Sequence, residues 1–530
     1  MDEERSTPLD KSFRRRDFVV ASAATGLALA GPLNYAAIAR QSRVPFAKGG
    51  KFKHGVAAGF PSQRGATLWT RLSGLERRSK LTLEVARDKG FRKVVKEREV
   101  VAAPNMDFTL HERIGGLKPG KEYFYRFATK NKSSRVGRFR TLAPPDSTRK
   151  VKIGFYSCQS WEAGFYNAQA GLAEEDLDLV VCLGDYIYER IFFEGPAGRK
   201  ADTTGVEGNV QTLEEYREKY RLYQSDKDLQ DMHAAHAFVS VWDDHEVEDN
   251  YAGDEQDSAE PDPNNENNGQ PRRIPFLERR RNGYKAFFEA MPRVRFKGDR
   301  NRIYGSLRLG GLAERFLTDQ RQYRDPQPCM DAQLTPCPAA DDPGRKMLGD
   351  EQKAWFKRAV PGSNATWKLW GSEVMLMSVD VPAGQPAILD AWDAYAAERQ
   401  EILDTFRAAG VQNLAAVTGD IHTFFAGDLS TTGRSGGRPI GVELVCGSAT
   451  SPGIPEALNV PSSTLEALAA ANNPHIKYDE YDSRGYGVVT VTKDALVTEF
   501  KTVDIQTRGA APQSLATITV DSGVPAVNVG

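Results

Sequence analysis

Four short apolar runs in this sequence end in the same way, in polar side chains that bind metal ions well. The runs lead into Ser157-Cys158-Gln159, Gly184-Asp185, Asp243-Asp244-His245-Glu246 and Gly419-Asp420-Ile421-His422. Ligands of open α/β sheets gather outside the carboxyl ends of the strands, so we expect these four ends to meet in one cleft. This requirement constrains the fold more than any other feature of the chain.

Helical patterns alternate with the apolar runs. The stretches 213–223 and 396–409 have helical periodicity, and residues 177–183 are almost continuously apolar, as in a strand buried on both faces. The alternation predicts an α/β catalytic domain over residues 150–505. Residues 252–275 are acidic and rich in Asn and Pro, and we expect them to form an irregular loop that shapes the cleft. Residues 506–530 show no strong pattern and are predicted to be a tail.

A different pattern precedes this domain. Residues 45–143 contain short alternating runs punctuated by Gly and Pro, which predicts a β-sandwich. The run 117–125, Leu-Lys-Pro-Gly-Lys-Glu-Tyr-Phe-Tyr, resembles the turn and strand of fibronectin type III domains. Residues 143–147 are Pro-containing and polar, and we interpret them as a stiff linker between two domains.

The first 39 residues resemble a twin-arginine export signal. Arg15-Arg16 stands before a weakly apolar stretch rich in Ala and Gly, and residues 37–39 offer a small-x-small cleavage site. A membrane anchor is the alternative, but Gly31 and Pro32 interrupt the stretch before it reaches about 18 strongly apolar residues. We therefore expect a signal peptide at residues 1–39, the twin-arginine export machinery as a partner, a periplasmic or extracellular location and no stable membrane span after processing.

The overall composition is that of a soluble globular protein. Hydrophobic residues make up 40% of the chain, and the 70 Lys and Arg nearly balance the 71 Asp and Glu. A net charge of −1 gives no support for a specific nucleic-acid partner, which needs a basic surface.

The five cysteines fall into three groups. Cys329 and Cys337 flank a short polar loop and could form a local disulfide in an oxidising compartment, if the geometry allows it. Cys182 and Cys446 lie in apolar runs and are expected to be buried. Cys158 alone of the five lies in one of the polar segments that end the apolar runs, so it is the cysteine considered for a chemical role.

Each polar strand end has a simple structural explanation when taken alone. A Gly-Asp pair often forms a turn, and a single Cys or His is often a core residue. Residues 243–246 are harder to explain, because three acids and a His in succession cost electrostatic energy unless a cation lies among them. A shared metal site accounts for all four strand ends together.

These motifs, in this order, resemble those of the PhoD-like alkaline phosphatases within the calcineurin-like metallophosphoesterases. The motifs are Gly184-Asp185-x-x-Tyr188, Trp242-Asp243-Asp244-His245-Glu246, Asp319-x-Arg321-x-Tyr323-Arg324, Asp390-Ala391-Trp392-Asp393-x-Tyr395 and Gly419-Asp420-x-His422. The resemblance covers the whole mature chain. It implies an α/β four-layer metallophosphoesterase sandwich preceded by a fibronectin III-like β-sandwich.

The resemblance also implies a set of metal ligands. The wider superfamily uses Asp-x-His, Gly-Asp-x-x-Asp, Gly-Asn-His and Gly-His-x-His, and here Cys158, Tyr188, Asp244 and Asp420 stand at replaced positions. Purple acid phosphatases share the Gly-Asp-x-x-Tyr form, in which the Tyr binds ferric iron, and PhoD relatives hold Fe³⁺ together with Ca²⁺. We therefore expect two kinds of ion.

The donor types agree with this expectation. Thiolate and phenolate favour a transition ion, and carboxylates favour a hard cation such as Ca²⁺. The expected iron ligands are Cys158, Asp185, Tyr188 and His422. Calcium is expected to share Asp185 and to bind Asp244 and Asp420. Asp243, Asn250 and Glu373 are further candidates for calcium binding or for supporting the ligands.

Three basic side chains have two possible roles each. His245 resembles the superfamily's non-ligating His, which donates a proton to the leaving oxygen or a hydrogen bond to the phosphate, so it is the expected catalytic residue. Alternatively it only orients a neighbouring ligand. Arg321 and Arg324 either bind substrate phosphate or pair with nearby carboxylates.

The function implied is an exported phosphatase or phosphodiesterase, active at alkaline pH, that scavenges phosphate from mono- or diesters. A phospholipase D-type phosphodiesterase could use the same site. A secreted metal- or surface-binding protein is a non-enzymatic alternative, but it has no need of an unligated His245 beside two metals. An iron oxidoreductase, suggested by Cys158, has no use for the carboxylate-rich half of the site.

Overall fold

The computed structural model describes residues 44–192, 195–196, 199, 209–256, 273–331, 337–382 and 385–530. The predicted signal peptide lies outside these residues, as does the part of the predicted irregular loop from 257 to 272.

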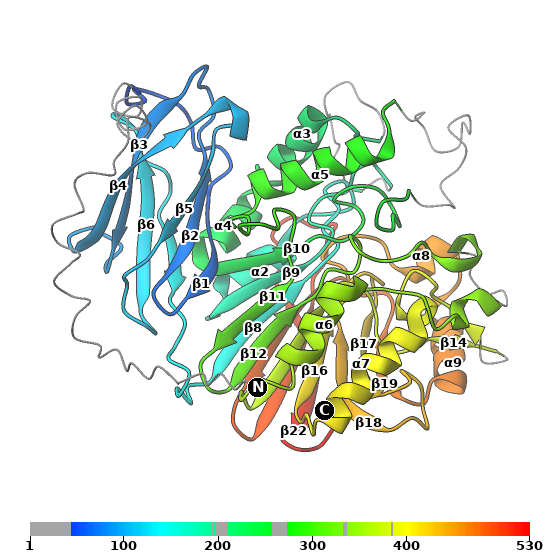
Figure 1. Ribbon diagram of the computed structural model, residues 1–530. Coiled ribbons are helices and arrows are strands. Elements are labelled where there is room, and N and C mark those ends of the chain that lie inside the picture. The colour runs from blue at the N-terminus through cyan, green and yellow to red at the C-terminus, as the bar shows by residue number, and fades with distance from the viewer. Residues whose placement is uncertain are drawn as a thin grey trace, which may run out of the picture.

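A mixed sheet of ten strands runs through the molecule (Figure 1). Its strands, in spatial order, are β23 (Asn528–Val529), β22 (Gln513–Asp521), β21 (Ala495–Thr502), β20 (Gly485–Val491), β8 (Val151–Tyr156), β9 (Leu179–Leu183), β10 (Ala237–Val241), β1 (Val56–Ser62), β2 (Gly65–Arg71) and β5 (Thr109–Ile114). The neighbours β8, β9, β10 and β1 are parallel, and the flanking pairs are antiparallel. The carboxyl ends of β8, β9 and β10 therefore lie at one edge.

A second sheet of seven strands packs against the first. Its strands, in spatial order, are β11 (Gly305–Leu309), β12 (Ala313–Leu317), β13 (Trp367–Ser372), β16 (Leu414–Thr418), β18 (Pro439–Val445), β17 (Phe424–Ser430) and β19 (Ile476–Glu480). Phe424 on β17 meets Phe500 on β21 with ring centroids 5.1 Å apart, inside the apolar core that both sheets share. This core fixes the two sheets face to face.

Helices cover the outer faces of both sheets, which completes four layers (Figure 1). The ten-stranded sheet carries α2 (Asn167–Glu174), α3 (Leu213–Tyr223), α4 (Lys227–Ala235) and α5 (Phe276–Ala290), and the seven-stranded sheet carries α6 (Gly349–Ala359) and α7 (Ala396–Ala408). On the second sheet, Phe356 of α6 contacts Trp370 of β13 and Phe406 of α7. The α/β fold predicted from the sequence is confirmed, and the predicted helices at 213–223 and 396–409 become α3 and α7.

The remaining elements are short or peripheral. They are α8 (Ile454–Leu458), α9 (Ser462–Asn472), the strand pair β14 (Asp380–Val381) and β15 (Gln385–Pro386), and the 3-10 turns η1 (Pro104–Met106), η3 (Pro328–Asp331), η4 (Pro338–Asp341) and η5 (Trp392–Tyr395). A disulfide joins Cys329 and Cys337, while Cys182 and Cys446 are buried thiols. Among the helices in the described part of the chain, none combines the length and the apolar character needed to cross a bilayer.

The N-terminal domain is a β-sandwich, as predicted. A sheet of β4 (Val94–Ala102), β3 (Ser79–Ala86), β6 (Glu122–Ala128) and β7 (Gly137–Arg140) lies against β1, β2 and β5 (Figure 1). The buried Tyr123 hydroxyl accepts a hydrogen bond from the backbone N–H of Lys118 at 3.0 Å. This contact fixes the turn before β6, in the manner of the tyrosine corner of immunoglobulin-like sandwiches.

The expectation of two separate domains joined by a stiff linker is corrected. β1 pairs in parallel with β10, with Ala58 opposite Ala237, so one sheet continues through both domains. At Gly59 a Cβ would lie 2.1 Å from the carbonyl oxygen of Pro292, so only Gly permits this close approach. Pairing between two strands so far apart in the chain leaves no local pattern in the sequence. It therefore could not be predicted from the sequence.

Residues 506–530 are also more than a tail. They form β22 and β23, which extend the ten-stranded sheet beyond β21. Burial in β22 alternates, with Ala516, Ile518 and Val520 facing the core. In the sequence these residues alternate with Thr517 and Thr519, a strand pattern that the sequence analysis did not recognise.

We predict that Tyr123→Phe lowers the free energy of unfolding by about 1 kcal/mol, because it removes the hydroxyl that pairs the Lys118 N–H. Tyr125→Phe is the matched control. Its hydroxyl is equally buried but has no hydrogen-bond partner among the described residues, so its loss should be nearly neutral. Urea unfolding of the full chain measures both, and equal losses would contradict the role given to the Tyr123 hydroxyl.

Candidate metal centre

The four polar strand ends meet, as expected. Cys158, Asp185 and Asp243 follow the adjacent parallel strands β8, β9 and β10, and Asp420 follows β16 of the facing sheet. Hydrogen bonds join the two sheets here, because the N–H of Ala449 donates to the Ser157 carbonyl at 2.9 Å. The site is therefore built across the interface between the sheets.

Several of these residues have left-handed backbone conformations. The φ angles are 58° at Cys158, 52° at Asp185, 70° at Asp420 and 57° at His422, where non-glycine residues are strained. Strain of this kind clusters at functional sites, because the surrounding structure must hold it in place. Before Asp185, Gly184 is required, because its φ is 110° and a Cβ would lie 2.4 Å from the Asp243 Cβ.

Glu246 is fully buried and holds two of the strand ends together. Its carboxylate accepts hydrogen bonds from the backbone N–H groups of Tyr186 at 2.7 Å, Asp243 at 2.7 Å and Asp185 at 3.2 Å. Burial raises the pKa of Glu246 to about 8, while the N–H donors act in the opposite direction. The side chain thus positions the loops after β9 and β10 relative to one another.

The first cluster of possible ligands contains Cys158, Asp185 and His422, whose ligand atoms lie within 4.8 Å of one another. The Tyr188 hydroxyl is 3.1 Å from Asp185 Oδ2 and 3.2 Å from His422 Nε2. His422 Nδ1 donates to the carbonyl of Pro452 at 2.5 Å, so the lone pair of Nε2 faces the cluster. All four residues that were expected to bind iron are brought together.

Two further clusters continue from the first. Asp185, Asp244 and His245 form one, and Asp243, Asp244 and Asp420 form the other. Asp185 is shared by the first two clusters and Asp244 by the last two. This sharing is the arrangement expected for a carboxylate that bridges two ions.

The protein alone favours the charged form of Asp244, whose pKa Arg321 and His245 lower against the effect of burial, but not those of the other anionic ligands. Burial raises the pKa of Cys158, Asp185, Tyr188 and Asp420 well above their ordinary values, and nearby carboxylates add to the shift. Burial lowers the pKa of His422 to about 4, which leaves it neutral. Anionic thiolate, phenolate and carboxylate together with a neutral imidazole are the ligand forms that a cation would stabilise.

His245 lies next to the clusters and is oriented by a carboxylate that the sequence analysis did not single out. Its Nδ1 lies 2.8 Å from Glu189 Oε2, and its ring packs against Tyr188 with centroids 4.2 Å apart and the planes inclined at 31°. Burial alone lowers the pKa of His245, but the carboxylates of Asp244, Asp185 and Glu189 raise it well above its ordinary value. The surrounding carboxylates thus favour the protonated form of the ring.

Arg321 and Arg324 are both engaged with protein groups. The guanidinium of Arg321 is fully buried and pairs with Asp243, with Asp390 at 2.7 Å and with Asp420 at 3.2 Å. Arg324 pairs with Asp390 at 2.6 Å. Of the two roles considered for these arginines, the structure supports the ion-pair role.

The three further candidates differ in their placement. Asp243 belongs to the third cluster, and its Oδ2 is buried without a hydrogen-bond partner among the described residues. Asn250 adjoins the site, because its N–H donates to Asp244 Oδ2 at 2.7 Å. Glu373 is fully buried, but it belongs to none of the three clusters found among the described residues.

Sequence reasoning missed Glu189, Glu246 and Ser451 as supporting residues. Glu189 and Glu246 directly follow the motif residues Tyr188 and His245, but adjacency in the chain does not tell which groups they contact. Ser451 donates to the Tyr188 hydroxyl at 2.8 Å from a loop 263 residues away, for which the sequence offers no signal.

Comparison with known proteins agrees with this geometry. A family model described as "PhoD-like phosphatase" matches residues 153–500, and a second, "PhoD-like phosphatase, N-terminal domain", matches residues 38–143. The chain belongs to the PhoD-like phosphatase family. As a member of this family it is a phosphoric ester hydrolase, which confirms the resemblance drawn from the motifs.

The matches to two individual relatives cover nearly the whole of this PhoD-like chain. Alkaline phosphatase D of Bacillus subtilis (strain 168) is 32% identical over 533 residues, which cover 95% of this chain and 86% of that protein. A solved structure of PhoD is 30% identical, with a TM-score of 0.81 over 92% of this chain and 93% of that one. Such relatives imply metal-dependent catalysis, for which the three clusters are the candidate sites.

A more distant solved structure shares the fold. The purple acid phosphatase PPD1 of yellow lupin seeds is 11% identical, with a TM-score of 0.54 over 88% of this chain and 74% of that one. This likeness concerns the fold alone.

We predict that Glu246→Gln lowers both stability and metal content. The amide replaces one acceptor oxygen by a donor facing backbone N–H groups, which should cost roughly 2 kcal/mol of unfolding free energy. Glu398→Gln is the control, because Glu398 is also buried and accepts the N–H of Leu348, but it does not bind the backbone of a cluster residue as Glu246 does. Metal content that falls equally in both variants would contradict a specific positioning role for Glu246.

Proposed function

We propose that this PhoD-like phosphatase hydrolyses phosphate mono- or diesters at alkaline pH with one Fe³⁺ and Ca²⁺ held at the described clusters. The observation that carries this proposal is the division of donors within one site. Sulfur and phenol oxygen from Cys158 and Tyr188 stand on one side of Asp185, and the carboxylates of Asp244 and Asp420 belong to the other clusters. Soft and strongly anionic donors suit iron, and hard oxygen donors suit calcium.

The residues present fit these ions. Asp185 Oδ1 and Asp243 Oδ2 are buried without hydrogen-bond partners among the described residues, which is costly unless something else satisfies them. Both atoms belong to residues of the clusters. Cations among the carboxylates would offset the repulsion that raises the pKa of Asp185 and Asp420.

Bound ions would supply an activated water and neutralise charge on the phosphoryl oxygens. The chain's own residues supply the rest. Glu189 accepts the Nδ1–H of His245, which leaves Nε2–H to donate a proton to the departing ester oxygen. Arg321 holds Asp243 and Asp420 in place, and Glu246 fixes the loop that carries Asp185.

The same proposal includes export and a role in phosphate scavenging. The support is the Arg15-Arg16 pair followed by the Ala- and Gly-rich stretch, which resembles a twin-arginine signal. That route carries folded proteins, so the metal centre would be assembled before export. We propose a periplasmic or extracellular location on this basis.

We predict that Cys158→Ala removes iron from the protein while calcium is largely retained, because only the first cluster contains the thiol. Cys182→Ala is the matched control, since Cys182 is a buried thiol outside the clusters. Elemental analysis of protein exported by its own signal should give about one iron per chain in wild type and control. Zinc alone, or iron retained in Cys158→Ala, would contradict the assignment.

We predict that His245→Asn slows hydrolysis by roughly 10²- to 10⁴-fold for substrates with a poor leaving group, which needs protonation. The loss should be much smaller for p-nitrophenyl phosphate, whose leaving group departs as an anion. Steady-state rates with phenyl and p-nitrophenyl phosphate measure the difference. Equal losses for both substrates would remove His245 from the role of proton donor.

Release of inorganic phosphate from monoesters is the expected outcome of the activity assay. Release of a headgroup from phosphatidylcholine, with monoesters left intact, would instead favour the phospholipase D-type alternative. A protein that binds iron and calcium but cleaves neither kind of ester would favour the non-enzymatic alternative.

A further inference from the structure

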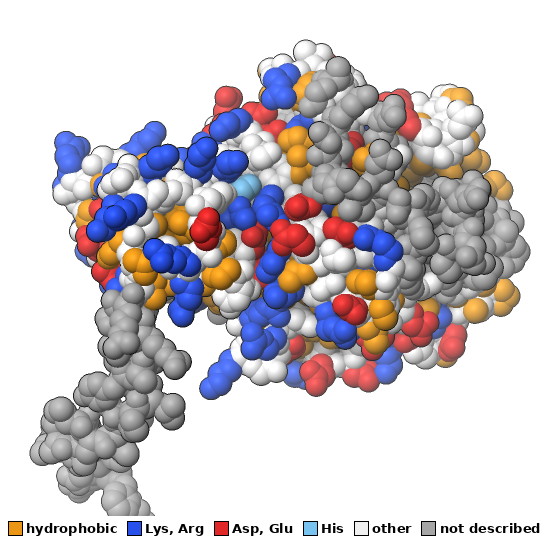
Figure 2. All heavy atoms as spheres, turned by 90° about the horizontal axis from the view of Figure 1, so that it is seen from above, with side chains coloured by type: hydrophobic (Ala, Val, Ile, Leu, Met, Phe, Trp, Pro, Cys, Tyr) orange, Lys and Arg blue, Asp and Glu red, His pale blue; other side chains and the backbone are white. Residues whose placement is uncertain are grey.

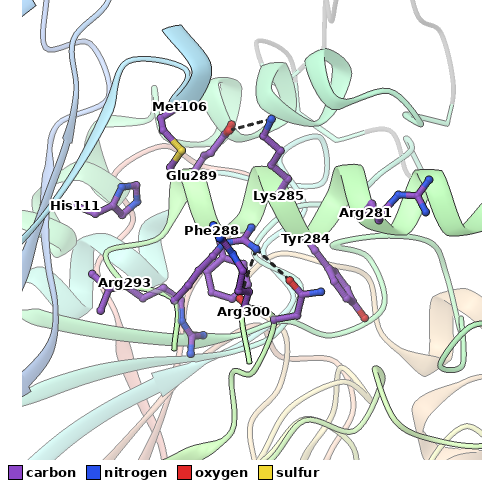
Figure 3. A pocket seen from close by; sticks show the side chains of 12 residues that line it. Met106, His111, Arg281, Tyr284, Lys285, Phe288, Glu289, Arg293 and Arg300 are labelled. Carbon is purple, nitrogen blue, oxygen red and sulfur yellow. Dashed lines mark hydrogen bonds and ion pairs between the residues drawn. The ribbon is translucent and has the colours of Figure 1, made fainter. Parts of the chain in front are cut away.

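A pocket of about 530 Å³ lies where the N-terminal domain meets α5 (Figure 3). Met106 and His111 of the N-terminal domain line it on one side, and α5 with the segment that follows it lines the other. None of its lining residues belongs to the metal clusters. The pocket is therefore a second cavity, separate from the catalytic centre.

Five lining residues carry a positive charge. They are Arg281 and Lys285 on α5 and Arg293, Arg295 and Arg300 after it. Among the described lining residues Glu289 is the single acid, and its carboxylate is already bound by both Arg217 Nε at 2.7 Å and Arg217 Nη2 at 2.9 Å. Lys285 lies 4.0 Å from the same carboxylate. The pocket therefore has a positive charge that the protein does not neutralise.

The arginines of the pocket rest on aromatic rings rather than on carboxylates. Arg295 lies 4.1 Å from the centroid of Phe288, and Arg293 lies 4.6 Å from that of Phe60. Among the described residues neither of them forms an ion pair, and neither do Arg281 and Arg300. Stacking fixes a planar guanidinium in place. Part of its N–H edge is used within the protein, because Arg295 Nη1 donates to Asn301 Oδ1 at 3.1 Å. Nε and Nη2 of Arg295 have no hydrogen-bond partner among the described residues and can donate to phosphate.

Arg293 gives the strongest indication of a missing counterion. Its side chain is only 2% exposed, and its two Nη atoms donate to the carbonyl oxygens of Ser240 and Ile303. Its Nε has no hydrogen-bond partner among the described residues. Among the described residues no carboxylate forms an ion pair with Arg293, and Asp319 acts on it only from a longer distance, so an anion in the pocket would reduce the cost of burying this cation.

The surface around the pocket is also positively charged. Residues 291–302 contain five Lys or Arg and one acid, Asp299, although the whole chain has a net charge of −1. In Figure 2 Lys and Arg side chains gather over the N-terminal domain and beside its junction with the rest of the molecule. An anion approaching this face would be attracted toward the pocket.

We propose that this pocket binds an anion with two or more phosphate groups. The volume exceeds what a single phosphate fills, and the charged groups come from the middle of α5 and from the segment beyond the helix. The pocket wall also contacts the catalytic domain's strand end, because Tyr284 stacks on Trp242 at 4.1 Å with parallel rings, and Trp242 precedes Asp243. This inference does not rest on the identity of the metals.

The test is calorimetric titration of methylenediphosphonate, a diphosphate analogue that resists hydrolysis, into the full chain. Asp185→Asn provides the background in which the metal centre is disabled. Binding should persist in that background and weaken roughly tenfold or more when Arg281→Ser and Arg300→Ser are added. The exposed pair Arg77→Ser and Arg78→Ser, which does not line the pocket, is the control and should leave binding unchanged.

A second measurement needs no variant. Phenylglyoxal modifies exposed arginines, and peptide mass spectrometry should show that methylenediphosphonate protects Arg281 and Arg300 but not Arg77 and Arg78. Absence of protection, or equal weakening by the pocket and control pairs, would overturn the proposal. Orthophosphate binding as tightly as the diphosphonate would overturn the requirement for two phosphate groups, and citrate binding as tightly would overturn the preference for phosphate. Because ester hydrolysis is not measured, failure here would leave the proposed catalytic function untouched.

Discussion

The burial of like charges at the strand ends is the constraint on which the rest of the site depends. Asp185 shares one cluster with Asp244, and Asp243, Asp244 and Asp420 form another, in which only Asp420 is partly exposed. Arg321, together with His245 and Arg324, offsets part of the repulsion between these carboxylates. Carboxylates held this closely are stable only with further cations among them. The family's metal-dependent chemistry follows from this charge arrangement.

Holding that arrangement requires a rigid framework. The ligands follow strands of two facing sheets, and their backbones are strained into left-handed conformations. Glu246 ties the loops of the first sheet together. Ser451, in the loop after β18 of the second sheet, donates its backbone N–H to the Cys158 carbonyl and its hydroxyl to the Tyr188 hydroxyl. The shared apolar core between the sheets supplies the stability that pays for this local strain.

The sequence predicted the features that have a local pattern. Apolar runs that end in polar motifs located Cys158, Asp185 and Asp420, and helical periodicity located α3 and α7. The pairing of β1 with β10 could not be predicted, because it depends on contacts between distant segments. The role of Glu189 could not be predicted for the same reason, because it depends on a contact with His245, 56 residues later in the chain. β22 pairs with β21 just before it, and its alternating pattern was overlooked in the sequence.

The most direct test of the account is a crystal structure with anomalous diffraction recorded on both sides of the iron absorption edge. The account predicts an iron signal among Cys158, Asp185, Tyr188 and His422, and a lighter ion without iron anomalous signal beside Asp244 and Asp420. Zinc at the first position, or iron bound away from Cys158, would contradict the central claim that this charge arrangement is built for two different ions.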